Sequence, residues 1–424
     1  MLDVVILWDW AEFALRWLHV ITAIAWVGSS FYFIALDLGL RRHGGLPSGV
    51  TGEEWQVHGG GFYHVQKYGV APAHMPEHLT WFKWESYATW LSGAALLAVV
   101  YWAGAELYLI DPGKADLSLW VAIALSAGSI AAGWLVYDAL CRSALGRRPT
   151  AMMLALFALI VVMAFALDQV FTGRAALLHL GAFTATIMSA NVFFVIIPNQ
   201  KIVVADLKAG RTPDPDYGRI AKLRSTHNNY LTLPVLFLML SNHYPLAFGS
   251  DYAWVIAALV FLMGVTIRHF FNTMHAGGRW PWWTWGATAA VFAAIVALSV
   301  APGYRAGPET AGVAEAEAQA RLHRAMAAEG FAEVRDIVTL RCSMCHAEEP
   351  LWPGLAAAPG GVSLETDAQI AAQARPIYLQ AGVTHAMPPG NLTWMEPAER
   401  AAIVDWFRQM RRGSEGAHRQ AALQ

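Results

Sequence analysis

Charged residues are scarce in this chain. Lys, Arg, Asp and Glu make up only 14% of its 424 residues, and apolar residues make up 56%. A typical soluble protein carries roughly a quarter charged residues. Up to about residue 302 the charges stand in short groups between long apolar runs, and beyond it the composition is ordinary. This division predicts a membrane region at 1–302 followed by a water-soluble region.

Three further features are rare or missing. The formal net charge is only −2, so we expect no nucleic-acid partner. Of the three cysteines, two belong to one short motif and Cys141 stands alone, which argues against a disulfide framework. Acidic residues such as Asp3 and Asp9 stand where a secretory signal carries basic ones, so no cleavable signal is expected.

Long apolar runs, by contrast, are abundant. Eight stretches are long enough for a helix that crosses a bilayer, which needs about 20 residues. They lie near 11–36, 80–104, 118–140, 150–170, 175–198, 229–248, 252–273 and 281–301. Spans one and five each have a histidine near the start and aromatic residues near the end, which favours a parallel repeat of four helices plus four. We therefore expect an all-α fold with an eight-helix transmembrane bundle.

The basic residues between the spans predict the orientation. On one side of the bundle lie thirteen Lys and Arg residues, and on the other only Lys114 and Arg174. Because Lys and Arg are enriched in cytoplasmic loops, the side with thirteen is the cytoplasmic one. Both termini and the soluble region are then expected on the opposite face.

The soluble region contains Cys342-Ser343-Met344-Cys345-His346. This spacing is typical of covalent haem attachment, in which two thiols bond the haem and His346 binds the iron. The sixth ligand is expected to be Met387 in a proline-rich loop, with His385 and Met395 as alternatives. The pattern resembles class I cytochromes c and predicts one haem c.

These features predict the domain boundaries and the location. The expected order is a membrane domain at 1–302, a linker at 303–324, a cytochrome domain at 325–413 and a tail at 414–424. Covalent haem attachment takes place in the periplasm of bacteria. We therefore expect the N-terminus and the cytochrome domain on the periplasmic face of the inner membrane.

Histidines within the apolar runs predict a second haem. His19 and His179 lie at similar depth near the periplasmic side of spans one and five. Ionisable groups within spans are costly and are usually functional, and imidazoles from two helices can clamp one iron. In the alternative interpretation, both histidines bond neighbouring helices. We take His19 and His179 as the expected ligands of a haem b.

A denser polar layer lies near the cytoplasmic side. It includes residues 58–67 (His-Gly-Gly-Gly-Phe-Tyr-His-Val-Gln-Lys), residues 226–230 (Thr-His-Asn-Asn-Tyr), Arg268 and His269. Residues 226–230 are expected to enter span six at a helix N-terminus, where the helix dipole favours an anion. The mixture of bases, cations and amides is what a polar, planar substrate requires.

Together these segments resemble the bacterial membrane-bound urate oxidases. The resemblance rests on the order of the spans, residues 58–67, residues 226–234 (Thr-His-Asn-Asn-Tyr-Leu-Thr-Leu-Pro) and the cytochrome tail. In that family an integral membrane domain is fused to a cytochrome c. The resemblance implies oxidation of urate to 5-hydroxyisourate in purine catabolism. It also implies that electrons pass through haem to a cytochrome c or a terminal oxidase in the respiratory chain.

The chemistry of urate suggests roles for the cytoplasmic layer. Urate is a flat anion edged by amide groups, so its site needs a cation, amide side chains and a base. For the charge we expect Arg268 or Lys67, and for the amide edges Asn228 and Asn229. The base is left open among three histidines, namely His64, His227 and His269. An electron-transfer subunit and a quinol dehydrogenase are alternative functions, but neither explains this polar layer as well.

Overall fold

The computed structural model describes residues 4–69, 72, 75–300, 319, 322–353, 355 and 358–421. The chain divides into two compact units, Met1–Arg305 and Ala306–Gln424. Most of the linker predicted at 303–324 and the end of the tail predicted at 414–424 lie outside the described residues. Each unit has buried apolar residues of its own.

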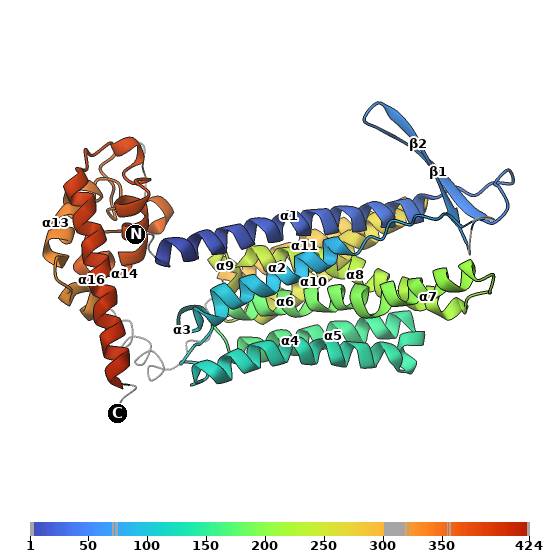
Figure 1. Ribbon diagram of the computed structural model, residues 1–424, viewed down its shortest axis with the longest axis horizontal. Coiled ribbons are helices and arrows are strands. Elements are labelled where there is room, and N and C mark those ends of the chain that lie inside the picture. The colour runs from blue at the N-terminus through green and yellow to red at the C-terminus, as the bar shows by residue number, and fades with distance from the viewer. Residues whose placement is uncertain are drawn as a thin grey trace. The chain divides into compact units, whose positions relative to one another are not determined.

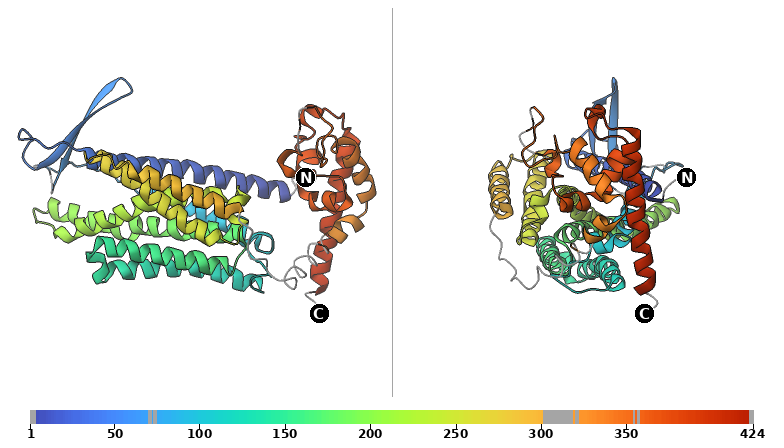
Figure 2. Two further views of the ribbon diagram at one scale, coloured as in Figure 1. Left: turned by 180° about the vertical axis from the view of Figure 1, so that it is seen from behind. Right: turned by 90° about the vertical axis from the view of Figure 1, so that its left-hand side faces the viewer.

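The first unit consists mainly of long helices that lie side by side along a common direction (Figures 1 and 2). In chain order these are α1 (Val4–Gly39), α2 (Trp84–Leu96) continued by the π-helix η1 (Leu97–Trp102), α4 (Leu119–Arg142), α5 (Pro149–Asp168), α6 (Gly173–Ala190) continued by the π-helix η3 (Asn191–Ile196) and α7 (Ile197–Lys208), α8 (Pro215–Ser241), α10 (Ala253–His275) and α11 (Trp283–Val300). Short turns of helix at α3 (Ala105–Tyr108), η2 (Ala144–Arg147) and α9 (Pro245–Phe248) stand between them.

Five helical segments of the described chain are long and apolar enough to cross a membrane. They are Ile6–Gly39, Leu119–Arg142, Pro149–Asp168, Gly173–Lys208 and Ala253–His275. A shorter apolar helix covers Trp283–Ser299. The described chain is therefore mostly helical, and these five segments coincide with the spans predicted near 11–36, 118–140, 150–170, 175–198 and 252–273. The bundle of eight transmembrane helices stays a prediction.

Helix α8 begins much earlier than predicted. It starts at Pro215 instead of residue 229, because Asp214 caps it by accepting a hydrogen bond from the N–H of Asp216 and proline suits a first helical turn. Residues 226–230 consequently lie inside α8. The prediction that they form a helix N-terminus is wrong, since N–H groups of a helix interior are bonded within the helix.

A β-hairpin follows α1, and the all-α prediction missed it. Strand β1 (Val50–His58) pairs antiparallel with β2 (Gly61–Tyr68), with Trp55 opposite His64. The turn residues Gly59 and Gly60 have φ values of 59° and 79°, which glycine adopts without a steric penalty. A glycine pair between β-forming residues was the overlooked hairpin signal. The hairpin projects from the helices near the end of α1 (Figure 1).

Close helix contacts determine the packing of the first unit. Gly133 on α4 faces Phe183 on α6, where a Cβ atom would lie only 1.8 Å from the ring. Gly264 on α10 faces Pro234 on α8, where a Cβ atom would lie 2.6 Å from the proline Cδ. Because the two glycines have no side chain, these helix pairs approach closely. The second contact lies one turn from Arg268 on α10.

The second unit contains α13 (Phe331–Arg341), η4 (Pro359–Gly361), α14 (Asp367–Ala372), α15 (Ala374–Ile377), the π-helix η5 (Tyr378–Val383), η6 (Pro389–Asn391) and α16 (Pro397–Ala421). Trp406 on α16 is 1% exposed, and its ring centroid lies 5.8 Å from that of Phe331 on α13. Phe407 stacks on Tyr378 at 4.3 Å. Helix α16 therefore joins the start of this unit to the segment that leads to Met387.

Candidate functional site

Residues 342–346 form a tight turn at the end of α13. The N–H groups of Cys345 and His346 both donate to the carbonyl of Cys342, at 3.1 and 2.9 Å. Both cysteines are free thiols, and burial raises the pKa of Cys342 to about 11. The Nδ1 of His346 lies 2.8 Å from the carbonyl of Val362. Because a carbonyl only accepts, Nδ1 carries the proton and Nε2 keeps a lone pair for iron. These residues fit a covalently held haem c.

A buried arginine holds the loop that carries Met387. Arg400 of α16 is 7% exposed. Its Nη1 donates to the carbonyls of Ala381 and Met387, at 2.5 and 2.9 Å, and its Nη2 donates to Asn391 at 3.0 Å. The main chain on both sides of Met387 is thereby fixed, while the Met387 side chain stays half-buried. Met387 as sixth ligand stays a prediction, and the structure gives it a rigid support.

His179 is fully buried in the bundle with both ring nitrogens engaged. Its Nδ1 donates to the carbonyl of Ala175 at 2.8 Å, so its Nε2 must accept from the hydroxyl of Ser126 at 2.7 Å. Ser126 accepts in turn from the indole N–H of Trp102. In this arrangement His179 has no lone pair left for iron and does not fit a haem clamp. The haem b expected at His19 and His179 stays a prediction.

His19 on α1 contacts helix α2. Its Nδ1 lies 3.0 Å from the carbonyl of Thr89 and 3.1 Å from the hydroxyl of Ser92, both on α2. The absence of a side chain at Gly93 makes room for this ring, since a Cβ atom there would lie 2.9 Å from it. The contacts of His19 join α1 to α2, as the alternative interpretation expects.

The predicted catalytic residue His64 lies on the hairpin. Its ring stacks on Trp55, with centroids 4.2 Å apart, and its Nε2 lies 2.8 Å from the carboxylate of Glu53. Gln66 and His43 also bond this carboxylate, and these hydrogen bonds lower the pKa of Glu53 to about 2. His64 is therefore held beside a permanently charged carboxylate outside the helices.

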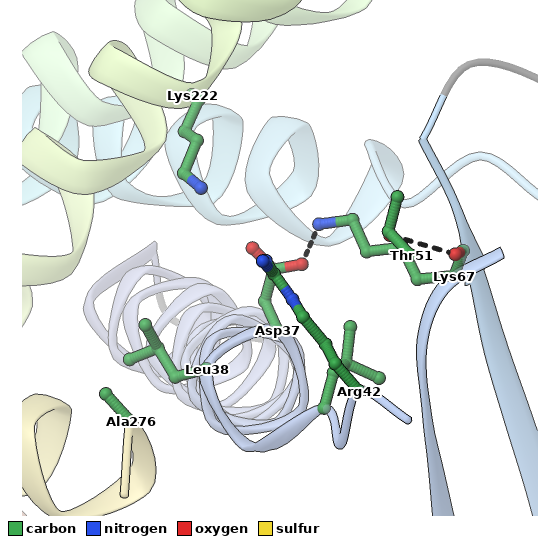
Figure 3. A pocket seen from close by; sticks show the side chains of 8 residues that line it. Asp37, Leu38, Arg42, Thr51, Lys67, Lys222 and Ala276 are labelled. Carbon is green, nitrogen blue, oxygen red and sulfur yellow. Dashed lines mark hydrogen bonds and ion pairs between the residues drawn. The ribbon is translucent and has the colours of Figure 1, made fainter. Parts of the chain in front are cut away.

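Lys67, also on the hairpin, lies beside the end of α1 and forms an ion pair with Asp37. The two residues line a cavity of about 280 Å³, called the basic pocket below (Figure 3). Its lining comprises Asp37, Leu38, Leu40, Arg42, Thr51, Lys67, Lys222 and Ala276. Burial and the nearby Lys222 lower the pKa of Lys67. The hairpin and the ends of α1 and α10 thus enclose a cationic cavity against α8.

His227 and Asn228 belong to a buried hydrogen-bond network. Arg224 donates to Asn191 at 3.1 Å, and Asn191 donates to Asn228 at 2.9 Å and to the Tyr137 hydroxyl at 3.0 Å. Tyr137 therefore donates to Nδ1 of His227 at 2.8 Å. The opposite nitrogen, Nε2 of His227, is buried and has no hydrogen-bond partner among the residues that the structure describes. This network joins α4, the π-helix η3 and α8.

Asn229 and Arg268 meet in a separate cluster. Arg268 donates from Nε to Asn229 at 2.6 Å and from Nη2 to Asn272 at 3.1 Å. Asn229 donates to the same oxygen of Asn272 at 3.2 Å. The guanidinium lies 4.2 Å from the ring centroid of Phe31 on α1. These four residues, called the inner cluster below, combine a cation, two amides and an aromatic face.

The seven predicted catalytic residues thus occupy four places. Only Arg268 and Asn229 meet in the inner cluster, while His64 and Lys67 lie on the hairpin and His269 is exposed beside Trp283. Adjacent residues of a helix point about 100° apart, which separates Asn228 from Asn229. The prediction missed Phe31 and Asn272 as site residues. Asn272 stands four residues after Arg268, which is the spacing of neighbours on a helix surface.

Comparison with known proteins identifies the first unit. A family model described as urate oxidase N-terminal matches residues 5–299, which is more than half of the chain. The chain belongs to the urate oxidase N-terminal family. Neither a curated protein nor a solved structure gives a significant match. The urate oxidase N-terminal match includes the hairpin, the basic pocket and the inner cluster, and it indicates a urate-related oxidoreductase. Within the described residues, no group of three or more His, Cys, Asp or Glu is arranged to hold a metal ion.

Proposed function

We propose that this protein is a membrane-bound urate oxidase that sends the electrons of urate to a cytochrome c domain formed by its second unit. The inner cluster carries the proposal, because it lies within the family match and combines the groups that urate requires. The apolar helices support a place in the lipid bilayer. The Cys-x-x-Cys-His motif supports the route of the electrons.

The inner cluster suits a flat anion with amide edges. Arg268 supplies positive charge, and Asn229 and Asn272 supply both donors and acceptors within one small volume. Phe31 covers the guanidinium with an apolar ring, which reduces contact with water and strengthens attraction for an anion. Both Arg268 and Asn229 are less than 10% exposed. A urate oxygen would replace the hydrogen bonds that these side chains now make with one another.

The reaction balances with water as the oxygen source. Urate and water yield 5-hydroxyisourate, two protons and two electrons. When bound to this chain, a haem c accepts electrons one at a time and can pass them to a cytochrome c or a terminal oxidase. Cys342, Cys345 and His346 would hold it, with Met387 presented by the Arg400-supported loop.

The three candidate bases contact residues outside the inner cluster. Of the three candidate bases, His64 bonds Glu53, His227 bonds Tyr137, and His269 is exposed beside Trp283. In the part of the chain described by the structure, none of them hydrogen-bonds to the inner cluster.

Anaerobic turnover of the full-length protein in detergent tests the proposal. With urate as substrate and oxidised external cytochrome c as acceptor, we expect two cytochromes reduced for each urate consumed. Changing Cys342 and Cys345 to Ala should abolish this reduction. The proposal would be refuted if one peroxide formed in air for each urate consumed, or if cytochrome c were not reduced in the absence of oxygen.

A variant of Arg268 tests the place of the substrate. Arg268→Gln should raise KM for urate about 10- to 100-fold, since a hydrogen bond to a charged group contributes about 1.5–3 kcal/mol. Arg279→Gln, at an exposed arginine beyond α10, removes the same charge outside the cluster and serves as the control. Equal KM values for the two variants would place urate elsewhere.

A further inference from the structure

The basic pocket and the inner cluster lie along the same three helices. Asp37 follows Phe31 by six residues on α1, and Lys222 precedes Asn229 by seven on α8. At 1.5 Å per residue these separations are about 9 and about 10.5 Å. The pocket residue Ala276 directly follows α10 and likewise lies beyond the two cluster residues of that helix. The pocket is therefore roughly two helical turns from the cluster, toward the hairpin.

The pocket has an excess of positive charge. Its lining contains three cations, Arg42, Lys67 and Lys222, and one carboxylate, Asp37, so its formal charge is 3 − 1 = +2. Figure 3 shows Lys67 and Lys222 extending toward Asp37 from two sides, with Arg42 beside it. Asp37 forms an ion pair with Lys67. Unbalanced cations that converge on a cavity attract an anion.

We propose that the basic pocket is an entry site that binds the urate anion before it reaches the inner cluster. This inference rests on the proposed function and adds a second, outer site for the same substrate. A cavity of about 280 Å³ is close to the lower end of the range for small-molecule sites. The ligand class is a small organic monoanion, attracted by charge and oriented by the polar lining.

Electrostatics explains what such a site contributes. Clefts lined by one sign of charge raise the local concentration and the association rate of an opposite charge by about 10- to 1000-fold. Salt screens this effect, because the Debye length falls from about 30 Å at 0.01 M to about 10 Å at 0.1 M. From the pocket, urate would need to move only about two helical turns.

A double variant tests the entry site. Arg42→Gln with Lys222→Gln removes two charges and leaves the Asp37–Lys67 pair intact. We expect KM for urate to rise about tenfold at low salt, the lower end of the steering effect, with kcat unchanged. The increase should shrink at high salt. Lys208→Gln with Lys201→Gln, two exposed lysines of α7 outside the pocket, removes the same charge as the control.

The outcomes separate this inference from the proposed function. If the parent oxidises urate and the double variant keeps the parental KM and salt dependence, the entry site is overturned. If the parent does not oxidise urate, the binding of urate is measured by equilibrium dialysis instead. Binding that the parent and the control keep and the double variant loses supports the entry site. A KM effect confined to nanodiscs with anionic lipid, absent in neutral lipid, would assign the pocket to lipid headgroups and overturn the inference.

Discussion

At the scale of single residues, hydrogen bonds decide what each histidine can do. His346 and His179 both donate Nδ1–H to a backbone carbonyl, so in each ring the lone pair is on Nε2. In His179 this lone pair accepts a hydrogen bond from the hydroxyl of Ser126. For His346 no such bond is found among the described residues. The same tautomer therefore suits packing in one unit and iron binding in the other.

Arg400 provides a prediction at this scale. Arg400→Gln should leave the carbonyls of Ala381 and Met387 short of a donor, at a cost of about 1–3 kcal/mol. If Met387 binds the iron, the far-red absorption band of ferric Met-ligated haem should weaken. The haem potential should also fall, since Met ligation raises it.

Absorption spectra and redox titration of the full chain measure this effect, and thermal melting separates it from unfolding. Arg335→Gln, at an exposed arginine paired with its neighbour Asp336, is the control. An unchanged band and potential in folded Arg400→Gln protein would show that the loop needs no such support.

At the scale of elements, contacts between helices position the inner cluster. Pro234 on α8 and Gly264 on α10 are in close contact, and both lie near residues of the cluster. Two elements also differ from their predicted form: α8 starts at Pro215, and a hairpin follows α1. The first difference places Asn229 inside a helix, and the second supplies Lys67 to the basic pocket.

Gly264→Ala should therefore change the geometry of the inner cluster, although Gly264 is not one of its residues. The added Cβ would lie 2.6 Å from Pro234, so α8 and α10 must separate, and overpacking of this kind typically costs about 1–3 kcal/mol. We expect KM for urate to rise several-fold, as the Asn229–Arg268 bond lengthens, while the haem c spectrum stays the same. Gly286→Ala, where a Cβ atom meets nothing within 4 Å, is the matched control. Identical kinetics of the two variants would contradict this account.

At the scale of the whole molecule, the two units have separate tasks in our proposal. The helical unit carries the family match and the polar clusters, and the second unit carries the haem motif. This division requires the second unit to be on the periplasmic side, where haem is attached. The orientation rests on the unequal distribution of Lys and Arg between the loops.

Reporter fusions test this orientation. Fusions after Arg148 and after Arg224 should be active in the cytoplasm, because both positions belong to the basic side. A fusion after Gly307 should be active in the periplasm, as haem attachment requires. A cytoplasmic result at Gly307 would refute the orientation and the haem c with it.

The sequence by itself determined the features that depend on contiguous residues. Apolar runs of about 20 residues predict membrane helices, and the five residues from Cys342 to His346 are recognisable without any fold. The tertiary structure alone decided which polar side chains meet, because that depends on how each helix is rotated and packed. Asn228 and Asn229 are neighbours in the chain, yet one bonds Asn191 and the other Arg268. Phe31 and Arg268 are far apart in the chain, and the packing of α1 against α10 brings them together.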